Sequence, residues 1–155
     1  YMDLAQSLQQ TLGQAGTEVE IIPQDSSALW PKYRARRHQM ILARWGPDYL
    51  DPHSNADSFA HNPDNAEEAQ LTGKLAWRNA WVDEEINELT VAASQETDLE
   101  KRKEMYGQLF RMHQQASPFV LMFQQNEQIA RHEGVKGFVS GPSFDLVFYD
   151  GVTKE

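Results

Sequence analysis

The residues best placed for chemistry follow an apolar run at residues 40–43. Asp48 and Asp51 lie in a loop that begins at Trp45. Because ligands of α/β proteins bind beyond the carboxyl ends of strands, this position makes contact between Asp48 and a ligand one of two interpretations. A carboxylate in a closed cleft needs a cation as its partner, so the chemistry would be recognition of a positively charged group. The alternative is that Asp48 only caps a turn of the loop.

Two other chemistries were weighed for the same loop. A metal site would use Asp51, His53, Asp57 and His61, but these donors have no tight ligand spacing and no cysteine accompanies them. Turns capped by polar side chains explain them better. As a hydrolase pair, Asp48 and Asp51 would hardly face each other across a sugar ring, because both lie in one proline-rich loop. We therefore expect a protein that is not an enzyme, with no metal, no cofactor and no catalytic residue, and keep a hydrolase that uses Asp48 and Asp51 as the less favoured alternative.

The amino-acid composition of the chain limits the classes of molecule that it could bind. The chain has 155 residues, enough for a single domain, and 14 Lys and Arg against 23 Asp and Glu give a net charge of −9. This charge argues against nucleic acid as a partner, because phosphates require a basic face. The sequence contains no cysteine, which excludes disulfides. It opens inside an expected helix without a signal peptide, which we interpret as the start of a piece of a longer chain, so the missing signal says nothing about export.

The first elements alternate in type. An apolar stripe of leucines predicts an opening helix that stops at Gly16. Alternation over residues 17–22 predicts a half-buried strand, and a short helix capped by Asp25 follows it. The apolar run within residues 39–45 predicts a buried strand. This order is typical of an α/β fold.

The rest of the chain is a long loop region followed by helices and strands. Residues 46–82 are expected to be loop with short helical turns, and loops of this length are usually functional. Asp83 predicts the start of one helix, and a capping box at residues 97–100 predicts the start of a longer one. Strands are expected at residues 118–123 and 144–149. Together these elements predict an α/β fold with a mixed sheet flanked by helices.

Several motifs resemble one known family. Residues 45–52 read Trp-Gly-Pro-Asp-Tyr-Leu-Asp-Pro, which resembles the Trp-x-x-Asp-Tyr-x-x-Pro region of the solute-binding proteins of ABC importers, family 5. This family includes receptors for dipeptides, oligopeptides and nickel. Five further motifs agree with the family in order: the opening helix with the expected strand at residues 18–22, and the segments at residues 83–89, 96–106, 117–121 and 135–138.

The resemblance implies a two-lobed receptor with a periplasmic-binding-protein type II fold, which closes on its ligand like a hinge. Residues 1–155 would form most of the C-terminal lobe, without the N-terminal lobe. The implied function is capture of peptides or peptide-like solutes in the periplasm for the transmembrane subunits of an ABC permease. Opines, sugars and nickel chelates are the alternative ligands.

The resemblance also implies a set of ligand contacts. Asp48 would pair with the α-ammonium of a peptide, and the backbone around Ala43 and Arg44 would pair with an extended peptide as an added strand. Trp45 is either a platform for the ligand or a core residue at a strand end. Tyr49 is a candidate contact that also suits a structural role between loop and core. Asn79 either lies near the cleft or belongs to a loop anchored by two tryptophans.

Overall fold

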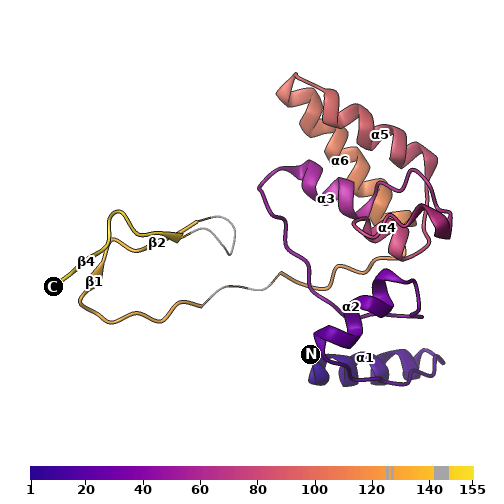
Figure 1. Ribbon diagram of the computed structural model, residues 1–155, viewed down its shortest axis with the longest axis horizontal. Helices are drawn as coiled ribbons and strands as arrows, with labels where there is room; N and C mark the ends of the chain where they lie inside the picture. The colour runs from indigo at the N-terminus through magenta and orange to yellow at the C-terminus, as the bar shows by residue number, and fades with distance from the viewer. Residues whose placement is uncertain (125, 127, 142–146) are drawn as a thin grey trace. The chain divides into compact units, whose positions relative to one another are not determined.

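The computed structural model describes residues 1–124, 126, 128–141 and 147–155. The chain divides into two compact units, Tyr1–Trp45 and Gly46–Glu155. Both are rich in helix, and short strands lie near the C-terminus of the second (Figure 1). Among the described residues, no helix is both long and apolar enough to cross a membrane.

The first helix of the first unit, α1 (Met2–Gln14), confirms the expected opening helix. Its leucines are half-buried rather than fully buried. The helix closes where Thr17 donates its backbone N–H to the carbonyl of Leu12 at 2.9 Å. Gly16 has a φ of +84°, a left-handed conformation that glycine adopts without strain.

The second helix, α2 (Ser26–Arg34), begins as its sequence predicts. The Asp25 carboxylate accepts the backbone N–H of Ala28 at 2.9 Å, which satisfies one of the free donors of the first turn. Tyr33 is buried, and its ring meets the edge of the His38 ring with a centroid distance of 4.9 Å. The helix is therefore fixed by a local cap and by the ring contacts of Tyr33 with Trp30 and His38.

The two expected strands of this unit, residues 17–22 and 39–45, have no regular secondary structure. The alternation of the first segment persists, because Val19 and Ile21 are half-buried between exposed glutamates. A strand needs a neighbour for its backbone groups. Here the side chain of Gln9, rather than a neighbouring strand, donates to the carbonyl of Val19 at 2.6 Å. The half-burial expected for residues 17–22 is found, but the prediction of a buried strand at residues 39–45 is wrong, because Met40 is 62% exposed and only Ile41 and Leu42 are half-buried.

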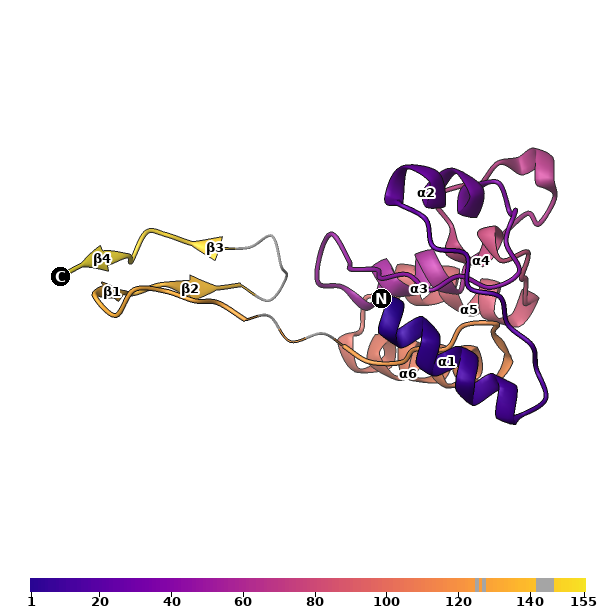
Figure 2. The ribbon, with the colours of Figure 1, turned by 90° about the horizontal axis from the view of Figure 1, so that it is seen from below.

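The second unit contains a group of packed helices. Helices α5 and α6 lie side by side, and α3 packs against both (Figures 1 and 2). The helical elements are α3 (Pro52–Phe59), the 3₁₀ turn η1 (Glu67–Ala69), α4 (Leu75–Arg78), α5 (Glu84–Gln95) and α6 (Leu99–Ala116). Their buried core contains Ala56, Ala60, Ile86, Ala93, Tyr106 and Leu109. Residues 46–82 therefore hold three helical elements as well as loop.

Helices α5 and α6 both begin at an aspartate cap. Asp83 and Asp98 each accept the third backbone N–H of their helix, at 3.1 and 2.9 Å. The predicted capping box at residues 97–100 places the cap of α6 at Thr97. The observed cap is Asp98, one residue later. Glu96 explains the difference, because its carboxylate accepts the next two backbone N–H groups, each at 2.9 Å.

The strands of the second unit form two antiparallel pairs (Figure 2). The pairs are β1 (Val135–Lys136) with β4 (Thr153–Lys154), and β2 (Val139–Ser140) with β3 (Val147–Phe148). Gly137 has a φ of +70°, and a Cβ there would collide with the carbonyl oxygen of Gly151. Glycine is thus required at residue 137, where the backbone passes close to the backbone of Gly151.

The expected mixed sheet is not found among the described residues, which combine helices with these two small sheets. The predicted strand at 144–149 contains β3, while residues 144–146 lie outside the described residues. The predicted strand at 118–123 is wrong for this structure. Val120 and Leu121 are 85% and 81% exposed, because no neighbouring strand covers them within the part of the chain described.

Candidate functional site

The candidate site centres on the loop at residues 46–50, which leads into α3. Asp48 is exposed in this loop, and Tyr49 is 55% exposed. The backbone N–H of Asp51 donates to the carbonyl of Tyr49 at 3.1 Å, which folds the end of the loop into a turn. A shallow hollow of about 200 Å³ lies beside it, lined by Pro47, Tyr49, Leu50, Asp51, Pro52 and Asn55.

Asp51 fixes the downstream end of this loop. It is the N-cap of α3, and its Oδ1 accepts the backbone N–H of His53 at 2.8 Å. The Arg102 guanidinium approaches the same carboxylate with two nitrogens, at 2.8 Å from Oδ1 and 3.0 Å from Oδ2. Such a fork-to-fork pair fixes orientation as well as distance. Asp51 therefore ties the start of α3 to the first turns of α6.

The Arg102 side chain is itself held by the core. Its guanidinium lies over the ring of Tyr106, 4.9 Å from the ring centre. Tyr106 is only 3% exposed and belongs to the core between the helices. Hydrogen bonds from Arg102 lower the pKa of the Asp51 carboxyl, and the same pairing raises the pKa of Arg102. Burial raises the pKa of Tyr106.

The other predicted contacts have less support from geometry. Ala43 and Arg44 are exposed and lie in no strand, and Trp45 is 39% exposed. All three belong to the first compact unit, whereas Asp48 belongs to the second. Asn79 is half-buried at the end of α4, where its side chain donates to the helix carbonyl of residue 75 at 2.9 Å.

A tryptophan anchors the segment before Asn79. The ring of Trp77 is 1% exposed, and its Nε1 donates to the carbonyl of Ala66 at 2.9 Å. This contact supports the structural interpretation of the segment, in which tryptophans hold the loop in place. Asn79 is also absent from the residues that line the hollow beside Asp48.

Three of the four residues considered for a metal, Asp51, Asp57 and His61, are used in side-chain contacts within the chain. Lys74 forms an ion pair with Asp57, and the His61 ring lies 3.2 Å from the same carboxylate. Burial acts to raise the pKa of Asp57, but the hydrogen bonds and charges of Lys74 and His61 together outweigh it, so the pKa is lowered. Within the described ranges, no group of three or more acidic, histidine or cysteine side chains is arranged to hold a metal ion.

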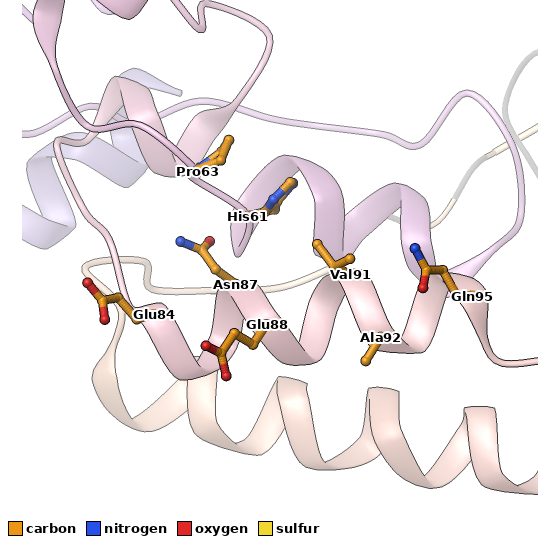
Figure 3. A pocket seen from close by; sticks show the side chains of 8 residues that line it. All are labelled: His61, Pro63, Glu84, Asn87, Glu88, Val91, Ala92 and Gln95. Atoms are coloured by element: carbon orange, nitrogen blue, oxygen red, sulfur yellow. The ribbon is translucent and has the colours of Figure 1, made fainter.

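A larger open pocket lies along α5 (Figure 3). Its volume is about 540 Å³, and its lining is His61, Pro63, Glu84, Asn87, Glu88, Val91, Ala92 and Gln95. Asn87 is not available for a ligand. Its side chain exchanges two hydrogen bonds of 2.8 Å with the backbone of the fully buried Asn62, which joins α5 to the segment after α3.

The sequence analysis missed the pairing of Asp51 with Arg102. The two residues are 51 positions apart, so no local pattern joins them. One signal was available, because an aspartate directly before a proline is typical of an N-cap followed by the first residue of a helix. That signal predicts the cap on α3 but not its arginine partner.

Comparison with known proteins gives two matches. Residues 1–67 match the sequence model of bacterial extracellular solute-binding proteins, family 5 Middle. The chain is also similar to the probable D,D-dipeptide-binding periplasmic protein DdpA of Escherichia coli (strain K12), with 25% identity over 145 residues. That alignment covers 94% of this chain but 27% of the relative, so the chain spans about a quarter of the relative's length.

The family match includes the loop that carries Asp48 and the cap at Asp51. The alignment with the relative extends over most of the helices and strands beyond it. The two comparisons confirm the resemblance drawn from the motifs, because residues 1–67 match the family 5 model of bacterial extracellular solute-binding proteins and the longer alignment is to a periplasmic binding protein.

Proposed function

We propose that this chain is part of the substrate-binding component of an ABC importer and that it captures peptides or peptide-like solutes. It would supply most of the C-terminal lobe of a two-lobed receptor, and the ligand would bind between the lobes. The similarity to a probable D,D-dipeptide-binding protein makes short dipeptides the first ligands to test.

One observation carries the proposal more than any other. Asp48 stands exposed in the loop at residues 46–50, and three residues later Asp51 is fixed by a cap and a forked ion pair. A carboxylate that is open to solvent, on a loop with an anchored end, is suited to meet a ligand's ammonium group. Closure of a second lobe would then remove water and strengthen that ion pair.

Each candidate residue has a role in this proposal. Asp48 pairs with the α-ammonium of the peptide, and the backbone at Ala43 and Arg44 pairs with an extended ligand. Tyr49, next to Asp48 in the loop, offers an aromatic surface to the ligand, and Trp45 is a separate aromatic candidate in the first unit. Asn79 is the weakest candidate, because its side chain already bonds to its own helix.

The chemistry of the loop favours binding over catalysis. A hydrolase that used Asp48 and Asp51 would need Asp51 free to take or give a proton. Its two oxygens instead accept bonds from one guanidinium and one backbone N–H, and its pKa is lowered by Arg102. We therefore propose that the chain has no catalytic role and needs no cofactor. It would work in the periplasm and deliver its ligand to the transmembrane permease subunits.

Calorimetric titration of the two-lobed receptor that carries this chain tests the proposal. The probes are D-alanyl-D-alanine, a pool of di- to pentapeptides, and N-acetylated copies of both. We expect the free peptides to bind, and acetylation to weaken binding because it removes the ammonium charge. Loss of one partner of a buried charge pair costs about 2–5 kcal/mol, or roughly 30-fold or more in Kd.

The matched variant is Asp48→Asn, which keeps the size of the side chain and removes its charge. We expect it to bind free peptides about as weakly as the wild type binds acetylated ones. Binding of sugars, opines or nickel chelates in place of peptides would keep the receptor class and overturn the peptide assignment. Hydrolysis of a peptide or glycoside that Asp48→Asn abolishes would overturn the receptor function itself.

A further inference from the structure

The link between Asp51 and Arg102 has a consequence for recognition. We propose that Arg102 is a positioning residue, which sets the place of the Asp48 carboxylate by clamping the end of its loop onto α6. This inference rests on the proposed function of Asp48. It assigns a role in ligand recognition to a residue on a different helix, outside the loop that would touch the ligand.

The first step of the argument is the reach of the chain. Three peptide units separate the Cα atoms of Asp48 and Asp51, and such a stretch spans at most about 10–11 Å. The stretch is shorter than this limit, because the Asp51 N–H bonds to the carbonyl of Tyr49. Pro47 and Pro52 each fix one φ angle at either end of the loop. A fixed Asp51 therefore leaves Asp48 little freedom of position.

The second step is how firmly Asp51 is fixed. Its carboxylate accepts three hydrogen bonds between 2.8 and 3.0 Å, two of them from Arg102. The guanidinium lies above Tyr106 in the core, so it has a defined position before it meets Asp51. Both charged side chains are partly shielded, with 22% of Arg102 and 33% of Asp51 exposed. The pair is a better anchor than a fully exposed one, whose members stay mobile.

The third step is that fixing Asp51 requires the forked geometry of the Arg102 guanidinium, because a positive charge alone does not set the orientation of the carboxylate. Lysine keeps the positive charge but is a single point donor, and it cannot engage both carboxylate oxygens in one plane. Arg102→Lys should therefore keep the attraction between the start of α3 and α6, but loosen the orientation of the Asp51 carboxylate. The matched control is Lys103→Met on the same helix, which removes an exposed pair with Glu100 and leaves Asp51 untouched.

The test measures the Kd of the two-lobed receptor for D-alanyl-D-alanine and for its N-acetylated copy. The ratio of the two Kd values reports how well Asp48 meets the ammonium group. We expect Arg102→Lys to lower this ratio about tenfold, a usual coupling between linked residues, and Lys103→Met to leave it unchanged. Circular dichroism melts confirm that each variant is folded at the temperature of titration.

A double-mutant cycle separates positioning from general damage. If Arg102 acts through Asp48, Arg102→Lys should weaken binding no further once Asp48→Asn is present. Asp51→Asn is the second variant, because asparagine is a good helix cap but forms a weaker partner for arginine. It should lower the same ratio even if Arg102→Lys fails to fold.

The outcomes distinguish the two proposals. If the wild type does not distinguish free from acetylated peptide, the proposed role of Asp48 fails and this inference fails with it. If the wild type does distinguish them and both variants keep its ratio, only the role of Arg102 is overturned. Equal losses for both peptides, or additive losses in the double mutant, would also overturn it by showing a merely structural role.

Discussion

The buried His113 near the end of α6 should make the stability of the second unit depend on pH. Its ring is 6% exposed and lies between aromatic neighbours, with the edge of Trp81 at a centroid distance of 5.4 Å and the stacked ring of Phe119 at 5.5 Å. Its Nε2 is 3.0 Å from the carbonyl of Phe59, at the end of α3. Because a carbonyl only accepts, the proton of the neutral ring lies on Nε2.

Burial lowers the pKa of His113, and its bond to the Phe59 carbonyl opposes that effect only in part. The folded state therefore binds the proton less tightly than the unfolded chain, in which the pKa is about 6.5. Stability is fully present above that value and falls as the pH decreases toward the lower pKa of the folded state. One such group changes the free energy of unfolding by at most about 1.4 kcal/mol per pH unit.

Urea unfolding followed by circular dichroism, at several values between pH 5 and pH 8, measures this slope. His113→Gln is the decisive variant, since a glutamine nitrogen can replace Nε2 as donor to Phe59 but does not titrate. We expect the wild type to lose stability from about pH 6.5 downward and the variant to lose less. His132→Gln, at an exposed histidine, is the control and should keep the wild-type slope.

Two results would refute this reasoning. The first is a wild-type slope that His113→Gln leaves unchanged, which would assign the pH dependence to other groups. The second is a rise in stability as the pH falls from 7 to 5. That sign would mean that the folded state binds the proton more tightly, in contradiction to the effect of burial.

Three further predictions concern packing and exposed surface. Leu109→Ala, at a side chain with 0% exposure, should cost about 2–5 kcal/mol of unfolding free energy in urea, whereas Leu99→Ala, 73% exposed, should change it by less than about 0.5 kcal/mol. Asn87→Ala should cost about 2 kcal/mol or more in the same assay, because it leaves the backbone N–H and carbonyl of buried Asn62 without their partner, and an unchanged midpoint would contradict that role. The exposed apolar run at Val120, Leu121 and Phe123 should make the 155-residue chain self-associate in sedimentation at micromolar concentrations, and lysine at the first two positions should reduce it; a monomer at all concentrations would exclude the effect.

Helices were predictable from the sequence because their signals are local. Asp25, Asp83 and Asp98 each accept a backbone N–H within the first turn of the helix that follows, so a few neighbouring residues determine where the helix begins. The glycine after α1 acts in the same local way at its end. The register error at residues 97–100 arose because Glu96, one residue upstream, also takes part in the cap.

Strands were less predictable because a strand is defined by its partner. Residues 17–22 and 118–123 have the apolar composition of strands, yet neither has a neighbouring ladder in the structure. The strand pairs that do form join short segments around Gly137, where a close approach of backbones requires glycine. Composition predicts the capacity for strand formation, whereas pairing depends on which segments meet.

The candidate site was predictable only in part. The motif at residues 45–52 makes Asp48 a candidate ligand contact, and the structure leaves that carboxylate exposed in a loop. The partner of Asp51 could not be found from local patterns, because Arg102 reaches it only after α3 and α6 have packed together. The support of this candidate loop is thus a property of tertiary structure, even though the loop itself carries a recognisable sequence.

A crystal structure of the two-lobed receptor with a bound free dipeptide would test the central claim most directly. The account predicts that a carboxylate oxygen of Asp48 lies about 2.7–3.0 Å from the ammonium nitrogen of the ligand, as in a charge-assisted hydrogen bond. It also predicts that Asp51 and Arg102 keep their forked pairing in the complex. An ammonium group that pairs with another carboxylate, while Asp48 remains in solvent, would contradict the claim.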